Sequence, residues 1–339
     1  MSNKPRFAII GCGKIAQRHA AEAAKHGSVN AVCDVIKEKA DRLGAKYNAV
    51  AYSSIDELLD KERHNADIVC ICTPNGLHAV HSIKSLNAGK HVLCEKPMAI
   101  HSIDAAIMIE AAEKSKKSLF VVKQNRFNPP VCFVKKILDE KKLGRIINFQ
   151  LNCFWNRPEE YYKNHWHGTK ELDGGILYTQ FSHFIDILYW FLGDLHSVNG
   201  YRSNKMHKGS IEFEDNGIAL LEMRDRVTGT LNYSINAFQK NMEGSLLILG
   251  ERGTVKIGGQ YLNELDYFAV ENEPWPDLPK GNFSNQYGYY EGSMSNHDKV
   301  YESFLKAIDD PAYPLASAYE TMKTVEIIEK IYKSSPMLS

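Results

Sequence analysis

Residues 6–16 read RFAIIGCGKIA, an apolar run that stops at a glycine and continues directly into a helix-forming segment. Gly11, Gly13 and Ala16 have the spacing G-x-G-x-x-A. The first glycine permits a tight turn, the second lets a pyrophosphate approach the backbone, and the alanine lets helix and strand pack closely. The start of the helix then offers free backbone amides to phosphate. The stretch predicts a strand–turn–helix unit that binds a dinucleotide. The predicted contacts are Gly11, Gly13, Lys14 and Ile15.

An acidic residue about 20 positions downstream supports this interpretation. Residues 29–33 form an apolar run, and Asp34 follows it directly. Its carboxylate can accept both hydroxyls of a ribose and would repel a 2′-phosphate, and neither Val35 nor Ile36 is an arginine. The pattern therefore favours NAD over NADP. An aspartate that caps the next helix is the alternative for Asp34 alone, but it leaves the glycines unexplained.

Strand-like and helix-like segments alternate from here to about residue 124, as in a parallel nucleotide-binding sheet. The apolar run at residues 67–72 ends in Thr73-Pro74-Asn75, with His78 just beyond. A loop at the carboxyl end of such a strand is expected to lie across the nicotinamide half of the cofactor. Asn75 as a helix N-cap and His78 as a first-turn residue are the structural alternatives.

A second loop of this kind follows residues 91–94 and reads Glu95-Lys96-Pro97. Pro97 lacks an amide hydrogen and fixes the turn, so the backbone of Lys96 is constrained. A solvated lysine in a surface turn is the alternative for Lys96 taken alone. The last strand, at residues 119–122, leads into Gln124, which we place with Glu95 and Lys96 among the cofactor contacts.

The second half of the chain has a different pattern. Period-two alternation at residues 146–155, and further strand-like runs between residues 217 and 270, follow one another without helices between them. We therefore expect an α/β Rossmann domain with a parallel sheet at residues 1–124. An α+β domain with a large, open, mostly antiparallel sheet should follow at residues 125–339.

Gly174-Gly175 opens an apolar segment at residues 176–191 that we interpret as one buried helix. Thr179, His183 and Asp186 are spaced i, i+4, i+7, which places them on one face of such a helix. A lone histidine in an apolar helix is usually a core residue. Its two polar neighbours on the same stripe favour a functional histidine.

The composition excludes several functions. Lys+Arg and Asp+Glu both number 41, so the chain lacks the basic surplus that electrostatic binding to nucleic acid needs. No apolar stretch is long enough to span a membrane. Seven cysteines, mostly in strand-like runs and without zinc-type spacing, indicate reduced thiols in a cytoplasmic protein, and no metal is expected.

The three motifs G-x-G-x-x-A, Thr73-Pro74-Asn75 and Glu95-Lys96-Pro97, in this order, resemble the Gfo/Idh/MocA oxidoreductases, and the resemblance covers essentially the whole chain. It implies an NAD-dependent sugar or inositol dehydrogenase with a Rossmann domain and an α+β substrate domain. It also implies a cis Lys96–Pro97 peptide and a lysine beside substrate and nicotinamide. In this family a second subunit usually covers the open sheet, so we expect a homodimer or homotetramer through the C-terminal sheet.

The same resemblance assigns catalysis to Lys96 and His183 and lets Asp186 touch the substrate. Oxidation of a secondary alcohol needs a base for the hydroxyl proton, which a histidine can supply near neutral pH. Lys96 would orient the hydroxyl and stabilise the developing oxyanion. Inositol dehydrogenases carry an aspartate four residues before the histidine, where this chain has Thr179.

Residues 166–175, WHGTKELDGG, resemble the nucleotide-sugar 3-dehydrogenases of this family, which act on UDP-N-acetylglucosamine or its uronate for surface polysaccharide and lipid A synthesis. Relatives commonly have arginine at the position of His167. An inositol or simple-sugar dehydrogenase is the alternative, and a non-catalytic NAD-binding regulator is a third reading. The expected substrate contacts are Lys96, Arg126, Arg157, Trp166, His167, Thr179, Gln180, His183 and Asp186. Further candidate donors to a diphosphate are Lys163, His165, Lys170, Asn296 and His297; a basic surface loop is the alternative for those before the helix.

Overall fold

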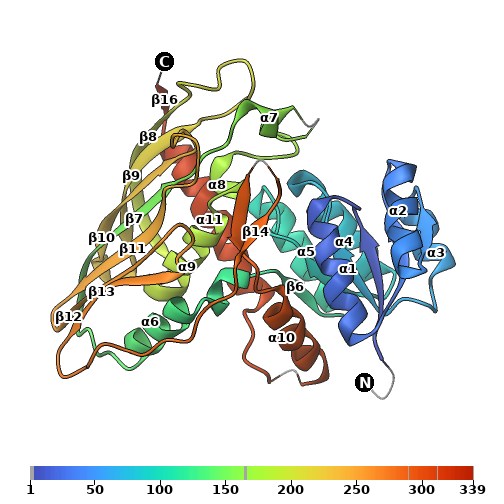
Figure 1. The fold of residues 1–339 in the computed structure, drawn as a ribbon, viewed down its shortest axis with the longest axis horizontal. Helices are drawn as coiled ribbons and strands as arrows, with labels where there is room; N and C mark the ends of the chain where they lie inside the picture. The colour runs from blue at the N-terminus through green and yellow to red at the C-terminus, as the bar shows by residue number, and fades with distance from the viewer. Residues whose placement is uncertain (1–3, 164–165, 289, 311, 339) are drawn as a thin grey trace. The chain divides into compact units, whose positions relative to one another are not determined.

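The computed structural model describes residues 4–163, 166–288, 290–310 and 312–338, which form two compact units (Figure 1). The first unit runs to Val122 and also takes in His297–Val325, and the second comprises Lys123–Asn296 and the chain from Glu326 onward. From the sequence, residues 125–339 were expected to form the second domain. That boundary misses the return of His297–Val325, whose side chains pack against the first sheet: the rings of Tyr301 and Phe7 lie 5.8 Å apart.

In the described part of the first unit, six parallel strands form a sheet with the order β3-β2-β1-β4-β5-β6. In chain order they are β1 (Arg6–Ile10), β2 (Ser28–Cys33), β3 (Val50–Tyr52), β4 (Ile68–Ile71), β5 (His91–Cys94) and β6 (Leu119–Val121). The central strands are buried along their length, as strands covered on both faces are. The strand order reverses between β1 and β4, which is where such sheets bind nucleotides. The Rossmann prediction is confirmed.

Helices follow the strands of this unit: α1 (Lys14–His26), α2 (Lys37–Tyr47), α3 (Ile55–Lys61), the 3₁₀ turn η1 (Asn75–Leu77), α4 (His78–Asn87), α5 (Ser102–Ser115) and, from the end of the chain, α10 (His297–Asp309) and the start of α11 (Ala318–Ser334). Ala16, Ala20 and Ala23 of α1 are fully buried. Their small side chains recur at helical spacing and let α1 approach its strands closely.

Ser54 caps α3 by accepting a hydrogen bond from the Glu57 amide.

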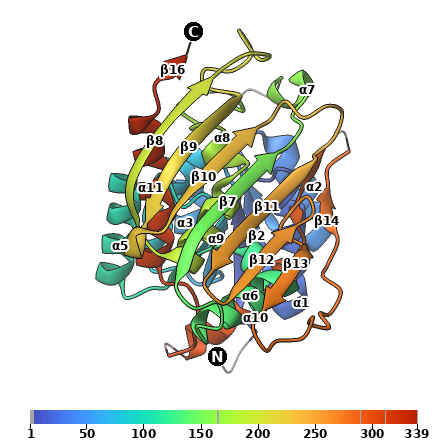
Figure 2. The same ribbon diagram turned by 90° about the vertical axis from the view of Figure 1, so that its left-hand side faces the viewer.

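The second unit is built on a mixed sheet of eight described strands in the order β13-β12-β11-β7-β10-β9-β8-β16 (Figure 2). They are β7 (Ile146–Phe154), β8 (Leu195–Ser203), β9 (Asn216–Met223), β10 (Thr228–Ser234), β11 (Glu243–Gly250), β12 (Gly253–Gly258), β13 (Glu264–Val270) and β16 (Met337–Leu338). The pairs β7–β10 and β8–β16 are parallel, and the other pairs are antiparallel. The expected mostly antiparallel sheet is therefore confirmed.

Helices pack on one face of this sheet and leave the other face without one, as far as the described residues go (Figure 2). The remaining elements are η2 (Gln124–Phe127), α6 (Pro129–Asp139), α7 (Glu159–Tyr162), α8 (Ile176–Thr179), α9 (Ser182–Leu192), η3 (Arg224–Arg226) and the short strands β14 (Ser284–Gln286) and β15 (Glu291–Met294). Alternation along β9 separates the faces: Ala219 and Leu221 are buried, whereas Ile218 and Leu220 are 49% and 62% exposed.

The helix expected at residues 176–191 is two helices, and that prediction was wrong. α8 ends at Thr179 and α9 begins at Ser182. The amides of Gln180 and Phe181 both donate to the carbonyl of Ile176, so the regular bonding pattern is lost there. Thr179 consequently does not share a helical stripe with His183 and Asp186.

All seven cysteines are free thiols, and six of them are buried. Burial raises the pKa of the Cys12 thiol to about 12, so this thiol stays protonated and unreactive at neutral pH.

Among the described helices, none has both the length and the apolar character of a membrane span.

Candidate active site

The turn after β1 leaves room for a phosphate. Gly11 has φ +89°, and a Cβ there would lie 2.6 Å from the carbonyl carbon of Cys72, so only glycine fits. A Cβ at Gly13 would meet nothing within 4 Å. Gly13 is the N-cap of α1, no side chain caps the helix, and its first turn holds no acidic residue. Lys14 and Ile15 therefore open a helix whose amides are available to an anion, which fits a dinucleotide pyrophosphate.

Asp34 lies directly after β2, and its carboxylate faces the glycine turn. Its Oδ2 accepts a hydrogen bond from the amide of Cys12 at 2.8 Å, and its Oδ1 accepts one from the amide of Ile36 at 2.8 Å. These bonds fix the carboxylate and leave each oxygen a second lone pair for a ribose hydroxyl. The neighbouring Val35 is 89% exposed, so the residue following the acid brings no cation to the ribose end.

His78 holds two loops of the first unit together. Its Nδ1 lies 2.6 Å from the carbonyl oxygen of Pro97, and its Nε2 lies 2.8 Å from the carbonyl oxygen of Thr73. Burial lowers the pKa of His78. Both ring nitrogens face backbone carbonyls, and a contact of His78 with the cofactor stays a prediction. His78 fixes the Thr73–Pro74–Asn75 loop against the turn that follows Lys96.

The loop after β5 presents Lys96 and turns Glu95 inward. The Lys96–Pro97 peptide is cis, as expected, and Lys96 is half-buried. Glu95 is 6% exposed, and its Oε1 lies 2.8 Å from His19 Nε2 and 3.2 Å from His297 Nε2. Its Oε2 accepts a bond from the Lys96 amide at 3.2 Å. Glu95 was expected among the cofactor contacts, but its carboxylate is committed to these buried donors.

In the second unit, Gln124 lies beside the histidine expected to act as base. Gln124 Nε2 is 3.3 Å from Nε2 of His183, and both side chains are buried. An amide NH₂ can only donate, so His183 Nε2 is the acceptor and the proton of a neutral ring lies on Nδ1. In that tautomer Nε2 carries the electron pair with which a general base takes a proton, and here this pair faces the Gln124 amide. Gln124 was expected to contact the cofactor; its amide nitrogen contacts His183.

Asp186 is paired with two cations of its own unit. Arg126 donates from Nε to Asp186 Oδ2 at 2.8 Å and from a terminal nitrogen to Oδ1 at 2.9 Å, and Lys123 Nζ lies 2.8 Å from Oδ1. Burial raises the pKa of Asp186, but the charges of Arg126 and Lys123 hold it well below its usual value. Arg126 also stacks on Trp190, with its guanidinium carbon 4.7 Å from the ring centre. Arg126 and Asp186 were both expected to bind substrate; the structure shows that they pair with each other, and their contact with substrate stays a prediction.

Thr179 serves a local role that the sequence did not indicate. Its hydroxyl donates to the carboxylate of Asp173, whose other oxygen accepts a bond from the Gly168 amide at 2.8 Å. Asp173 is fully buried. It therefore joins the segment that contains Trp166 and His167 to Thr179, the last residue of α8, and it is a residue that the sequence did not single out.

Tyr161 is the centre of a cluster that collects four of the expected substrate residues. Gln180 Nε2 donates to its hydroxyl at 3.2 Å, and the ring of His167 lies 4.1 Å from its ring. Trp166 stacks on His167 with centroids 3.8 Å apart. The guanidinium carbon of Arg157 is 5.4 Å from the Tyr161 ring. Sequence reasoning missed Tyr161 because only the fold brings these residues around it.

Arg157 is a buried cation in an aromatic environment. It is 4% exposed, and the rings of Trp155, Tyr161 and Tyr290 surround its guanidinium at 5.0, 5.4 and 5.2 Å. One terminal nitrogen donates to the Asn156 carbonyl at 2.6 Å and to Asn241 Oδ1 at 3.1 Å. In the described part of the chain its Nε has no partner, and its terminal nitrogens bond only to neutral oxygens, which are the backbone carbonyls of Asn156 and Glu291 and the side-chain amide of Asn241. A buried guanidinium without a counter-charge is a feature of anion sites.

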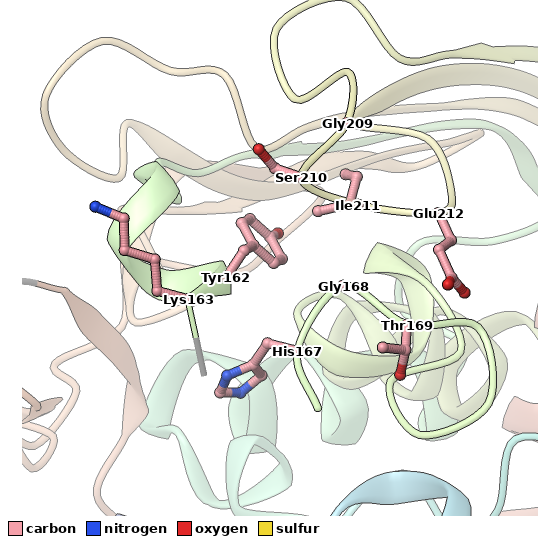
Figure 3. A pocket seen from close by; sticks show the side chains of 9 residues that line it. All are labelled: Tyr162, Lys163, His167, Gly168, Thr169, Gly209, Ser210, Ile211 and Glu212. Atoms are coloured by element: carbon pink, nitrogen blue, oxygen red, sulfur yellow. The ribbon is translucent and has the colours of Figure 1, made fainter. Parts of the chain in front are cut away.

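A polar pocket opens beside this cluster (Figure 3). The residues that line it are Tyr162, Lys163, His167, Gly168, Thr169, Gly209, Ser210, Ile211 and Glu212. In Figure 3 the amine of Lys163 points away from the other side chains, and Lys163 and Lys170 are exposed. Asn296 is buried and donates to the carbonyl of Gln124, and His297 is bonded to Glu95, so neither is placed as a diphosphate donor. His165 lies outside the described residues.

Comparisons with known proteins agree with this organisation. Residues 5–123 match the family model described as "Oxidoreductase family, NAD-binding Rossmann fold", and residues 132–256 match the "GFO/IDH/MocA C-terminal domain". The WlbA dehydrogenase from Bordetella pertussis, solved with NADH and UDP-GlcNAcA, is 33% identical, with 98% of this chain and 96% of that chain covered and a TM-score of 0.87.

Two further relatives are informative. The WlbA dehydrogenase from Chromobacterium violaceum, also solved with NADH and UDP-GlcNAcA, is 35% identical, with 98% and 94% coverage and a TM-score of 0.86. Levoglucosan dehydrogenase of Pseudarthrobacter phenanthrenivorans is 26% identical over 257 residues, which are 68% of this chain and 64% of that protein.

Proposed function

This chain belongs to the Gfo/Idh/MocA oxidoreductase family and is an NAD-dependent dehydrogenase, and from that premise we propose that it oxidises the 3-hydroxyl of a UDP-linked N-acetyl amino sugar. The substrate is UDP-N-acetylglucosamine or its uronate. The observation that carries the proposal is the similarity, over 98% of the chain, to two dehydrogenases that were solved with NADH and UDP-GlcNAcA. We assign the product to sugar synthesis for surface polysaccharide or lipid A.

His183 is the proposed base. Removal of hydride from a secondary alcohol leaves a charged oxygen unless a base takes the hydroxyl proton. The contact with Gln124 supports this role, because it favours the ring tautomer that has an acceptor at Nε2. Bound NAD supplies the hydride acceptor. Lys96 orients the hydroxyl and stabilises negative charge as it develops on the oxygen.

The cluster around Tyr161 is the proposed site for the nucleotide part of the substrate. Arg157 brings a buried positive charge without a carboxylate partner among the described residues. Trp166 and His167 bring stacked rings next to it. A UDP group needs a cation for its diphosphate and a flat apolar partner for its uracil, and these side chains offer both.

We also propose that the chain forms a homo-oligomer through the helix-free face of the second sheet. Large apolar side chains are exposed on strands of this sheet, and they include Ile147, Tyr201, Ile218, Leu220 and Tyr267. Exposed apolar groups gathered on one sheet mark an interaction surface. In the resembled family the usual cover is a second subunit.

Incubation with NAD and a panel of sugars tests the proposal, with reduced nicotinamide measured by its absorbance. We expect turnover of a UDP-N-acetyl amino sugar and thermal stabilisation of the protein by UDP, and we expect Arg157→Ala to weaken that stabilisation. Turnover of inositol or a simple sugar, without stabilisation by UDP, would favour the alternative dehydrogenase. An absence of turnover with every sugar, alongside NAD binding, would favour a non-catalytic regulator.

A further inference from the structure

A buried cluster of ionisable groups adjoins the backbone of Lys96, entirely within the first unit. His19 comes from α1, Glu95 from the end of β5, and His297 from α10. Both histidines are 0% exposed and Glu95 is 6% exposed. The helix that carries His19 is also the one whose first turn faces the expected phosphate site. The cluster therefore connects the dinucleotide turn with the backbone of Lys96.

The hydrogen bonds around His19 fit a doubly protonated ring. The Tyr301 hydroxyl lies 3.2 Å from the backbone carbonyl of His19 and 2.9 Å from His19 Nδ1, so it can donate to the carbonyl while it accepts from the ring. Nε2 of His19 lies 2.8 Å from the Glu95 carboxylate, which can only accept when ionised. With these partners both ring nitrogens can carry hydrogen, which is the arrangement of an imidazolium.

The other members agree with this assignment. Burial lowers the pKa of His19, but Cys72, Tyr301 and Cys70 raise it well above the usual value. Burial raises the pKa of Glu95, and the bonds from His19 and His297 hold it well below. Burial also lowers the pKa of His297, whose Nδ1 has no partner within the described ranges, as a neutral ring protonated at Nε2 allows. The cluster thus holds one positive and one negative charge.

We propose that the His19–Glu95 pair, with His297 as a second hydrogen-bond donor, positions Lys96. The positive charge of His19 balances the negative charge of Glu95, so the cluster next to Lys96 has no net charge. This inference rests on the proposed role of Lys96. Oε1 of Glu95 is fixed by the two rings, and Oε2 holds the Lys96 amide at 3.2 Å. The other polar groups around the pair are Cys70 and Cys72 near β4, Tyr301 of α10 and His78 of α4. His19, Glu95 and His297 are positioning residues that act through Lys96.

The charge argument gives a signed test with His19→Gln and Glu95→Gln, both close in shape to the native side chains. His19→Gln removes the imidazolium and leaves the negative charge of Glu95 uncompensated next to Lys96. The alkaline limb of the kcat–pH profile should therefore move to higher pH by about one unit. Loss of the carboxylate should move this limb down. Because displacement of a catalytic group by ~1 Å can cost ~100-fold, each kcat should fall about 10- to 100-fold. The Kd for NADH should stay within about threefold.

His26→Gln is the matched control, since His26 lies on the same helix and stacks on Tyr301 at 6.2 Å without a bond to Glu95. It should leave the pH profile unchanged. The double variant His19→Gln/Glu95→Gln restores charge balance and should bring the alkaline limb back. Shifts of the same sign in the two single variants, or an effect of His26→Gln as large as that of His19→Gln, would overturn the proposal.

A second measurement needs no substrate, so it separates this proposal from the proposed function. Nitrogen NMR of protein labelled at histidine should show, at pH 8.5, a doubly protonated ring whose signal His19→Gln removes and His207→Gln leaves in place. Its absence in the native protein would overturn the inference even if UDP-sugars are oxidised. One side-chain atom from each of His19, Glu95 and His297 lies within 4.8 Å of the other two, which is close enough for the three to bind a metal ion. Stoichiometric zinc or another metal in the purified protein would likewise overturn it.

Discussion

Arg126 and Asp186 form a buried, two-pronged ion pair in the second unit, with N–O distances of 2.8 and 2.9 Å. Lys123 adds a second cation at 2.8 Å. These residues lie on η2, just before it, and on α9, so the pair ties the start of the second unit to the helix that carries His183. From the sequence, both Arg126 and Asp186 were predicted to contact the substrate. Their ion pair also holds α9, the helix that carries His183, in place.

Asp186→Asn should destabilise the protein by about 3–5 kcal/mol, because it leaves two buried cations without a counter-charge. Urea unfolding of the two proteins measures the difference. Asp194→Asn is the control, since Asp194 forms an exposed pair with Arg224 and should cost less than about 1 kcal/mol. Equal losses in the two variants would contradict a special role for the buried pair. Because the pKa of Asp186 is depressed, its contribution is present above pH 4 and is lost as the pH falls further.

Asp34→Ala should weaken NAD binding, and Asp34→Ser with Val35→Arg should also improve the use of NADP. The reason is that the carboxylate offers acceptors to the ribose hydroxyls and repels a 2′-phosphate, whereas an arginine attracts one. The ratio of kcat/KM for the two cofactors is the measurement. An unchanged ratio in both variants would remove Asp34 from ribose recognition.

Lys96→Met and His183→Ala should each lower kcat about 100-fold or more, the usual scale for an oxyanion-stabilising group and a general base. NADH binding, measured by fluorescence, should survive in both, since neither side chain is assigned a main role in holding the dinucleotide. Near-normal turnover in His183→Ala would move the base to another group, with Tyr178 or Lys96 as the next candidates.

Glu214 should make the protein less stable as the pH rises from about 4.5 to 7. Burial raises its pKa to about 7, and it accepts a bond from the Tyr332 hydroxyl at 2.7 Å. A raised carboxyl pKa means that the folded state binds the proton more tightly, so the stabilisation is full below the unfolded pKa and is lost through pH 7. Urea unfolding at pH 5 and pH 8 should show a smaller difference for Glu214→Gln. An unchanged difference would refute the assignment.

Leu220→Lys on the helix-free face of the second sheet should reduce the size of the particle in solution, as measured by light scattering after gel filtration. A charge placed among exposed apolar side chains opposes their burial against a second subunit. Ile103→Lys is the control, because Ile103 is 67% exposed on α5 of the first unit. A native particle that is already monomeric would end the proposal of an oligomer.

The sequence by itself determined the strand–helix alternation of residues 1–122 and its dinucleotide turn, because the signals there are local; it did not show the return of His297–Val325 to this unit. Gly11, Gly13 and Asp34 act through backbone geometry that a few neighbouring residues define. The alternation of strands and helices also follows from the periodicity of nearby side chains. The same local reasoning correctly indicated strands in the second half, and it placed Lys96 and His183 at an active site as a proposal.

Tertiary structure alone decided which polar groups pair with which. Tyr301 contacts His19 across 282 positions, and Asp186 meets Arg126 across 60. No pattern within a helix or strand encodes such partners, since burial makes each ionisable group depend on whichever charge the fold brings to it. The break at residues 180–181 was missed for a different reason. Periodicity counts apolar positions, but it does not show that the amides of Gln180 and Phe181 both bond to the carbonyl of Ile176.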